Sequence, residues 1–367
     1  MAPDAEGHEP SRPPPDQQDV GGIFNRRTIL RGMTLFLVIT VAAMTGLFLY
    51  TNTGVSLSAL DDLRPAFLLI IIPLVFLDLL LGALRIHVFV RKLNRSARLW
   101  LSFRANLGNI FMGAMTPSQT GGGPAQLYIL HQGGISIAKG MSLGIINFLS
   151  TILVFVLAAG FSLAFLGNSF SSTLVNRLVV AGFIVFCLQL LWVLTAILRP
   201  SIFEKLFRGL ARAFSRMPLI TGRVHRLESW FTGFIASYRD TCGFFFRKEP
   251  AIVVQSFLIT AVLYLNKFTI AWLLMKGIGG HGAYIDVVAI HMLIYFISYF
   301  APSPGASGVA ELSTAALMSS ILPRGLLPVF ALLQRFFLLY IPVALGVPIV
   351  LSALRRRSAA PEEGGAP

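Results

Sequence analysis

The sequence of 367 residues has few charged residues and almost no cysteine, and both shortages exclude classes of protein. Charged residues make up 13% of the chain, against the roughly 25% that is typical of soluble domains. Its two cysteines, Cys187 and Cys242, are too few for a disulfide framework or a four-ligand zinc site. Composition therefore argues against both a soluble globular domain and a disulfide-stapled scaffold.

Motifs that would indicate chemistry on a metal or a nucleotide are also missing. His131 and His291 have no further ligands at the spacing of a metal site, and the glycine run 121–123 lacks the lysine of a phosphate-binding loop. We therefore predict that the chain uses no cofactor or metal and is not an enzyme. The formal net charge is +14, but the cations flank apolar runs, as orientation signals do. No nucleic-acid partner is expected.

Hydrophobicity is what the sequence has in abundance. Apolar residues make up 55% of the chain, and its mean hydropathy is +0.74. Six apolar runs are long enough to cross a bilayer as helices, which takes about 17–25 residues. They cover residues 32–50, 66–84, 141–166, 178–198, 251–275 and 326–354. The sequence thus predicts an all-α polytopic membrane protein with six transmembrane helices.

Two further apolar regions are each interrupted by a stretch that cannot be helical. Residues 116–126 contain two prolines and three glycines, and residues 299–311 contain two prolines, Gly305 and Gly308. The apolar pieces on either side of each break are too short to span. Because lipid cannot satisfy freed backbone groups, such breaks are buried by protein or line a cavity. We therefore predict two re-entrant helical hairpins that face one central site.

Basic residues are distributed unevenly over the predicted connections. With the N-terminus in the cytoplasm, most of the 30 Lys and Arg residues fall on the cytoplasmic side. The outer connections hold only Arg64, Arg177, Lys276 and Arg324. This positive-inside bias predicts a multi-pass protein of the bacterial cytoplasmic membrane with both termini inside.

Three segments fall outside the predicted spans. Residues 1–25 are rich in proline and polar residues and are predicted to be a disordered cytoplasmic tail; residues 355–367 form a second cytoplasmic tail. Segment 199–250 is predicted to be a basic amphipathic element on the cytoplasmic membrane surface. Its apolar stripe consists of Phe203, Leu206, Phe207, Leu210 and Phe214.

The two halves of the chain align with each other. A shift of 185 residues places Pro117 on Pro302 and Gln126 on Glu311, and it also aligns the starts of the second and fifth spans. Those two spans run in opposite directions under the predicted topology. The chain would then consist of inverted repeats, residues 30–167 and 177–354, as in many alternating-access transporters. A chance alignment of strings rich in glycine and proline is the alternative.

Charged side chains within apolar runs indicate a functional site. Counting about 1.5 Å per residue places Lys267 and Arg335 at similar depth, with Glu311 beyond the second break. A lone charge there costs about 2.5–3.5 kcal/mol, so we expect Glu311 to pair with Arg335 or Lys267. Two cations against one anion would leave a surplus positive charge for a phosphate; a purely structural pair is the alternative. Asp78 and His291 are expected to make helix contacts only.

We predict a site for a lipid headgroup between the two breaks, because glycine lets backbone approach a ligand and freed amides bind phosphate. The predicted site residues are Ser118, Gln119, Gly121, Gly122, Gly123, Gln126, Ser303, Gly305, Gly308, Glu311, Arg335 and Lys267.

Both breaks resemble the lysylphosphatidylglycerol synthase transmembrane family, also called the flippase-like domain family. Its TP…GG-x-P…Q pattern is matched at Thr116, Pro117, Gly121, Gly122, Pro124 and Gln126. Its P-x-P-G…G-x-x-E pattern and its later arginine are matched at Pro302, Pro304, Gly305, Gly308, Glu311 and Arg335. The resemblance covers about residues 30–354, within a predicted flippase-like transmembrane domain of residues 26–354. It departs from the pattern at Ala306, where the family usually has glycine.

What the resemblance implies is translocation of a lipid, with membrane lipids, anionic or aminoacylated, as partners. A homo-oligomer and a separately encoded lipid-modifying enzyme are compatible with it. Full-length synthases carry a soluble aminoacyl-transferase domain after the membrane part, and only residues 358–367 follow here, so synthesis of an aminoacyl lipid is not expected. One alternative is a membrane enzyme or accessory factor in polyprenyl-phosphate-linked glycosyl transfer. Another is a regulatory or scaffold protein that does not transport.

Overall fold

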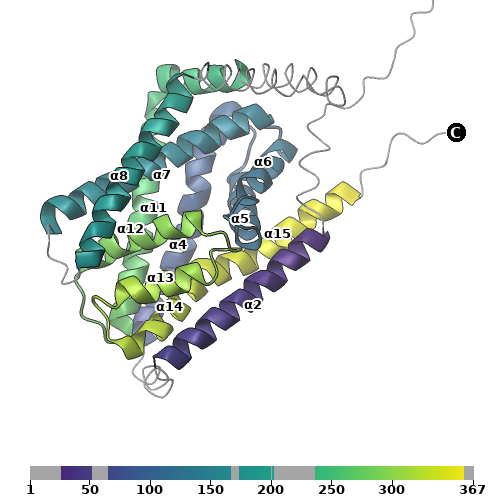
Figure 1. Ribbon diagram of the computed structural model, residues 1–367. Coiled ribbons are helices and arrows are strands. Elements are labelled where there is room, and N and C mark those ends of the chain that lie inside the picture. The colour runs from purple at the N-terminus through teal and green to yellow at the C-terminus, as the bar shows by residue number, and fades with distance from the viewer. Residues whose placement is uncertain (1–25, 52–64, 167–172, 200, 202–235, 359–367) are drawn as a thin grey trace, which may run out of the picture.

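The computed structural model describes residues 26–51, 65–166, 173–199, 201 and 236–358 (Figure 1). Across these residues the regular structure is helical and no strand is formed. An isolated antiparallel bridge joins Pro117 to Pro304. The prediction of an all-α architecture is confirmed. The two predicted terminal tails lie outside the described residues up to residue 25 and from residue 359, and residues 355–358 continue the last helix.

Long apolar helices dominate the described chain. Five stretches are long and apolar enough to cross a membrane, which makes this a multi-pass membrane protein. They are Ile29–Tyr50 in helix α2 (Arg26–Tyr50), Pro65–Leu93 (α4), Ile137–Phe161 in α7 (Ile137–Leu166), Pro250–Gly277 (α11) and Arg324–Ser352. Helix α8 (Thr173–Leu198) covers the remaining predicted span, but its qualifying part, Val180–Thr195, is a shorter apolar helix. The count of six spans therefore stays a prediction.

Two helix pairs are broken where the sequence predicts breaks. Helix α5 (Leu99–Met115) is followed by α6 (Gly122–Gln132), and α12 (Tyr284–Phe300) by α13 (Val309–Met318). Helices α6 and α13, with 11 and 10 residues, are too short to span a bilayer alone, and α5 and α12, with 17 residues each, lie at the lower limit of a spanning length. Helix α13 begins three residues earlier than predicted, because the Glu311 carboxylate accepts a hydrogen bond from the Gly308 N–H and caps the first turn. The re-entrant path of both pairs through a membrane stays a prediction.

Helices α4 and α11 pack against each other along their length and form the centre of the molecule (Figure 1). They are antiparallel. Lys92 at the end of α4 contacts Glu249, which precedes α11, at 2.8 Å, and Gly277 at the end of α11 lies against Phe67 near the start of α4. This arrangement agrees with opposite directions for the second and fifth spans, while the inverted repeat itself stays a prediction.

The last long stretch is not one uniform helix. A 3-10 turn (Arg324–Leu326) leads into α14 (Leu327–Arg335), a π-helical turn (Phe336–Tyr340) and α15 (Ile341–Ser358). Arg335 is therefore the last α-helical residue before the π turn. Such π turns are rare and occur frequently at functional sites.

Only the end of segment 199–250 is described; the apolar stripe of residues 203–214 lies outside the described residues. Residues 236–243 are helical and continue into a π turn (Phe244–Lys248). Tyr238, Cys242 and Phe245 are buried there, in a core shared with α4, α5 and α7. This part of the segment packs into the protein and does not simply lie on a membrane surface.

Candidate functional site

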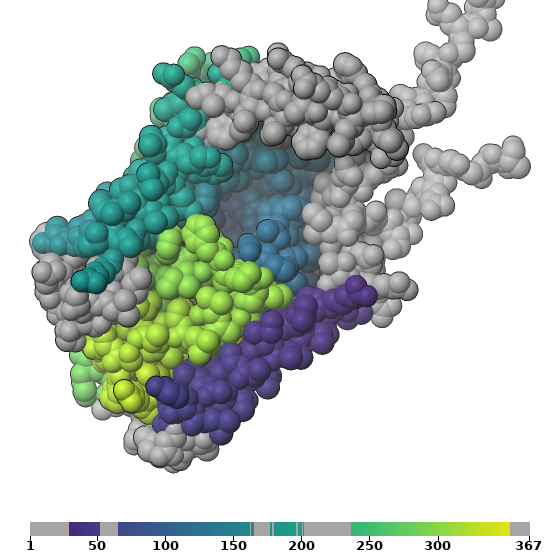
Figure 2. Space-filling view, in the orientation of Figure 1, coloured from purple at the N-terminus to yellow at the C-terminus, as the bar shows by residue number. Residues whose placement is uncertain are grey.

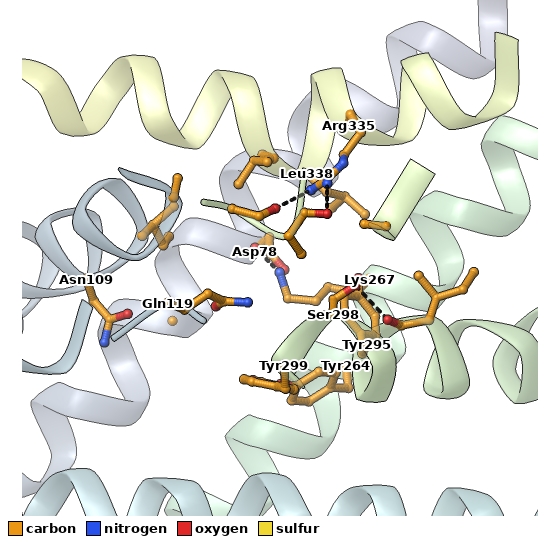
Figure 3. A pocket seen from close by; sticks show the side chains of 18 of the residues that line it. Asp78, Asn109, Gln119, Tyr264, Lys267, Tyr295, Ser298, Tyr299, Arg335 and Leu338 are labelled. Carbon is orange, nitrogen blue, oxygen red and sulfur yellow. Dashed lines mark hydrogen bonds and ion pairs between the residues drawn. The ribbon is translucent and has the colours of Figure 1, made fainter. Parts of the chain in front are cut away.

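The loop between α5 and α6, residues 116–121, is a compact turn stabilised by Thr116. The Thr116 hydroxyl donates to the carbonyl of Met112 at 2.7 Å and accepts the Gly121 N–H at 2.8 Å. Ser118 and Gln119 both have positive φ, 50° and 56°. Non-glycine residues rarely adopt this conformation. The side chain of Gln119 lies at the pocket described below (Figure 3).

Glycines 121 and 122 face the protein. A Cβ at Gly121 would meet the Thr116 side chain at 2.7 Å, and one at Gly122 would lie 2.8 Å from the carbonyl oxygen of Asn109. Their missing side chains let the start of α6 pack closely against α5. At Gly123 the corresponding space is open, so Gly123 remains a candidate for close backbone approach by a ligand.

A neutral hydrogen bond ties α6 to α5 below this loop. Asn109 on α5 donates its Nδ2–H to Oε1 of Gln126 on α6 at 2.8 Å. Gln126 is 8% exposed, and both side chains line the pocket. Gln126 was predicted as a site residue because it lies in the predicted break 116–126, whereas Asn109 lies in the apolar helix before the break and carries no charge that would single it out.

The loop between α12 and α13, residues 301–308, contains three residues with positive φ: Gly305 (57°), Ala306 (56°) and Gly308 (81°). The Ser303 hydroxyl donates to the carbonyl of Ser307 at 2.7 Å and closes the turn. A Cβ at Gly305 would lie 2.8 Å from the ring of Phe36 on α2. Glycine is therefore required at position 305 for both its conformation and its contact.

Arg335 and Glu311 form a buried ion pair that also organises this second loop. The Nε–H of Arg335 donates to Glu311 Oε1 at 2.9 Å. Its Nη1 and Nη2 donate to the carbonyls of Gly305 and Ala306 at 3.0 and 3.1 Å. The Glu311 side chain is 0% exposed and that of Arg335 13%. The expectation that Glu311 pairs with a cation is met by Arg335.

The two loops touch each other. The bridge between Pro117 and Pro304 joins their backbones, and the Ser118 hydroxyl donates to the carbonyl of Ala301 at 3.2 Å. Helix α2 holds the second loop from its other side, where Thr40 donates to the hydroxyl of Ser307 at 2.9 Å. Two loops that are about 185 residues apart in sequence thus form one contiguous polar element.

Lys267 pairs with Asp78 and not with Glu311, which corrects the expectation of a surplus positive charge. Lys267 Nζ on α11 lies 2.7 Å from Asp78 Oδ2 on α4, and the two side chains are 19% and 7% exposed. Asp78 therefore makes the expected contact between helices, and its partner is a cation. With one carboxylate for each of the two cations, Lys267 and Arg335 leave no surplus charge between them. His291 lies in the core, its Nδ1 2.9 Å from the carbonyl of Val287.

A polar cavity of about 260 Å³ lies beside the two loops (Figure 3). Five predicted site residues line it: Gln119, Gln126, Lys267, Gly305 and Arg335. The other seven, Ser118, Gly121, Gly122, Gly123, Ser303, Gly308 and Glu311, are not among its walls. The cavity is also lined by polar residues that were not predicted as site residues: Asp78, Arg85, Asn106, Asn109, Tyr264, Tyr295, Ser298, Tyr299, Thr314 and Gln334.

Arg85 is the most consequential of these additions. The second predicted span covers residues 66–84, so Arg85 was expected in the cytoplasmic connection that follows it. Helix α4 continues to Leu93, so Arg85 lies more than two turns from its end and faces the cavity. Helical spacing could have found it, since Arg85 follows Asp78 by seven residues, two turns along the same face.

The described residues offer no metal site, since they contain no group of three or more His, Cys, Asp or Glu that could hold an ion. The cavity instead combines buried ion pairs, amides and phenol hydroxyls. That donor set suits a polar organic group that carries charge and hydrogen-bonding atoms.

Comparison with known proteins identifies the family. The family described as "Lysylphosphatidylglycerol synthase TM region" matches residues 34–346. A UPF0104 membrane protein of Archaeoglobus fulgidus is 23% identical over 307 residues, which cover 82% of this chain and 90% of that protein. Members of the family are membrane domains associated with lipid flipping or modification. The residues matched span both loops, both ion pairs and the cavity, and the chain therefore belongs to the lysylphosphatidylglycerol synthase transmembrane family.

Proposed function

We propose that this protein translocates a phospholipid or a related lipid across the cytoplasmic membrane, with the headgroup passing through the cavity between the two loops. The observation that carries the proposal is the pairing of two contacting, non-helical loops with a polar cavity among helices long enough to cross a bilayer. Irregular backbone at membrane depth occurs where it is buried or lines a cavity. Broken helices that meet at a central site are typical of secondary transporters.

The size of the cavity fits a headgroup and not a whole lipid. About 260 Å³ is just below the roughly 300–1,000 Å³ of pockets that enclose drug-sized ligands. Acyl chains would have to remain outside the polar cavity. This division is what a translocator requires, because the chains gain nothing from leaving the hydrocarbon, whereas the headgroup needs a polar path.

The buried charges support a function beyond helix orientation. Two ion pairs, Lys267–Asp78 and Arg335–Glu311, sit among apolar helices, where hydrophobic replacements of similar volume are often neutral or stabilising. Charged residues within membrane segments are rare and mark the pathways of substrates and ions. Both carboxylates contact a cation at less than 3 Å, which argues against a free general base and hence against the glycosyl-transfer alternative. We therefore propose transport and not catalysis.

The proposed orientation has both termini in the cytoplasm. The contact between Lys92 and Glu249 places the end of α4 and the start of α11 on the same side, as this topology requires. Maleimide labelling of Arg247→Cys and His281→Cys, both at exposed positions near opposite ends of α11, tests it. We expect Arg247→Cys to react from the cytoplasmic side and His281→Cys from the outside; the reverse pattern, or both from one side, would contradict it.

Reconstitution tests the function. Protein in liposomes that carry a fluorescent phospholipid should expose inner-leaflet label to external dithionite, and Lys267→Gln should lose this activity. Lys92→Gln is a matched control, since Lys92 also contacts a carboxylate at 2.8 Å but is 47% exposed. The double variant Asp78→Asn/Lys267→Gln removes both buried charges, so it separates misfolding from loss of function. The proposal would be refuted if, for every labelled phospholipid, dithionite quenches no more label in liposomes with wild-type protein than in empty liposomes.

A further inference from the structure

The charges that line the cavity do not balance. Three cations, Arg85, Lys267 and Arg335, line it. Lys267 and Arg335 each form an ion pair with a buried carboxylate. Arg85 forms no ion pair with any carboxylate of the described residues; its contact is a hydrogen bond from Nη1 to Thr151 Oγ1 at 3.3 Å. Within the described part of the chain, Arg85 is therefore the cavity cation without a carboxylate partner, and it is not one of the cations predicted for the site.

Arg85 stands where the polar cavity meets an apolar path. Its partner Thr151 on α7 lines a second, smaller cavity of about 150 Å³, and Tyr299 lines both cavities. The second cavity shares Phe296 and Phe300 with a third, apolar one of about 440 Å³. The three cavities thus adjoin one another, from the ion pairs to the space between α8 and α12.

The molecular surface is hollowed in the same region. Figure 2 shows a depression between α8 and the α12–α13 pair, with the α5–α6 region at its floor. The third cavity is lined there by Val185 of α8 and by residues of α12, the second loop and α13. Its walls are almost entirely apolar, as a path for hydrocarbon chains requires.

Two buried polar atoms lie in the polar cavity that Arg85 also lines. Asp78 Oδ1 and the Tyr295 hydroxyl have no hydrogen-bond partner among the described residues, although both side chains line the cavity. Asp78 is 5% exposed, so a lone carboxylate oxygen there is costly unless a donor reaches it. A hydroxyl or ammonium group on a ligand would supply that donor.

We propose that Arg85 binds the phosphate of a lipid. The polar end of the headgroup reaches Asp78 and Tyr295, and an acyl chain leaves through the apolar path between α8 and α12. This proposal deepens the proposed function and rests on it for the assignment of the cavity to lipid. A guanidinium presents a planar fork that matches two phosphate oxygens. A phosphate lies between headgroup and chains in a phospholipid, as Arg85 lies between the polar cavity and the apolar path.

Binding measurements on purified protein test this assignment. Native mass spectrometry of the detergent-solubilised protein with added phosphatidylglycerol, and separately with diacylglycerol, reports the contribution of the phosphate. We expect Arg85→Gln to weaken phosphatidylglycerol binding about 10- to 100-fold, the loss of a charge-assisted hydrogen bond, and to leave diacylglycerol binding unchanged. Arg85→Lys should retain part of the preference. Arg91→Gln is the matched control, because Arg91 lies on the same helix but is exposed.

The outcomes separate this proposal from the proposed function. Arg85→Gln protein that melts like wild type and binds phosphatidylglycerol as tightly would overturn the role of Arg85, even if transport is found. If phosphatidylglycerol binding depends on Arg85 but the wild-type protein transports no lipid, the phosphate site at Arg85 is supported and the proposed translocation is refuted. A polyprenyl phosphate that binds with the same dependence on Arg85 would support the phosphate site and identify the lipid. Displacement of phosphatidylglycerol by inorganic phosphate at equal concentration would overturn the acyl-chain path.

Discussion

Removing the guanidinium of Arg335 should destabilise the protein more than removal of any other single cation. The side chain donates to the Glu311 carboxylate and to the carbonyls of Gly305 and Ala306. Breaking a buried pair by removing one partner typically costs about 3–5 kcal/mol. Because Glu311 is 0% exposed and the two carbonyls also lose a donor, Arg335→Gln should fall at the upper end of that range.

Lysine should not replace Arg335 fully. An ammonium retains the charge, but it is a point donor and cannot hold the carboxylate and both carbonyls in the fixed geometry of a guanidinium. Arg335→Lys should therefore keep the ion pair and lose one or both hydrogen bonds to the loop carbonyls, a cost of about 1–3 kcal/mol.

The double variant Glu311→Gln/Arg335→Gln should recover part of the loss, because it leaves no uncompensated charge. Full recovery is not expected, since the Gly308 N–H would lose its carboxylate acceptor at 2.6 Å. A coupling energy of about 0.5–3 kcal/mol is typical of residues in one network. The same cycle on Lys92 and Glu249, an exposed pair, should give less than about 1 kcal/mol.

Unfolding in mixed micelles, followed by circular dichroism, measures these differences, and the liposome assay runs beside it on the same variants. An unfolding midpoint of Arg335→Gln equal to that of the wild type would refute the energetic argument. So would a double variant whose loss is the sum of the two single losses. If the stable double variant transports lipid at the wild-type rate, the pair organises the loop and does not contact the substrate.

Three further outcomes follow from the described contacts. Cysteines at Ser118 and Ser303 should be joined by a short bifunctional reagent, because their loops touch; failure with reagents of every length, in folded protein, would contradict that contact. Ala306→Gly should raise the melting temperature and Ala306→Val lower it, since φ is 56° and a left-handed L-residue costs about 1–2 kcal/mol; the reverse order would contradict the strain. Burial raises the pKa of the Cys242 thiol, so the unfolded chain loses this proton at lower pH than the folded chain does. The free energy of unfolding should therefore fall as pH rises above about 8.5. Denaturant titrations in which Cys242→Ala shows the same fall would exclude the thiol as its source.

The helical architecture was predictable because each break carries its own local signal. Prolines and glycines favour the ends of helices, and the observed breaks, residues 116–121 and 301–308, lie within the predicted ones, residues 116–126 and 299–311. Helix ends were less predictable, because they depend on contacts. Helix α4 extends past residue 84, where the predicted span ends, to Leu93, and the Glu311 cap moves the start of α13.

The ion-pair partner of a buried charge was predictable where its depth along the helices decided the pairing. It was not predictable where the rotation of a helix about its axis decided it. Glu311 needed a cation at its depth, and the sequence offered Arg335 and Lys267; the structure selects Arg335. The rotation of α4 about its axis turns Asp78 toward Lys267 and Arg85 toward the cavity. The sequence of α4 is apolar on nearly all faces of the helix, as expected for a helix that spans a membrane. It therefore has no amphipathic stripe that would show which face lies toward the cavity.

The aligned positions Gln126 and Glu311 perform the same mechanical task with different chemistry. Each lies on the short helix after a break and ties that helix to a neighbour, Gln126 through Asn109 and Glu311 through Arg335. A neutral amide pair contributes about 0.5–1.5 kcal/mol net, and separating it exposes no charge. Separating a buried ion pair leaves two charges to be solvated, at several kcal/mol each. The first loop is therefore held less tightly than the second, so any separation of the two loops around a headgroup costs least when the α5–α6 side moves and the Arg335-bound loop stays in place.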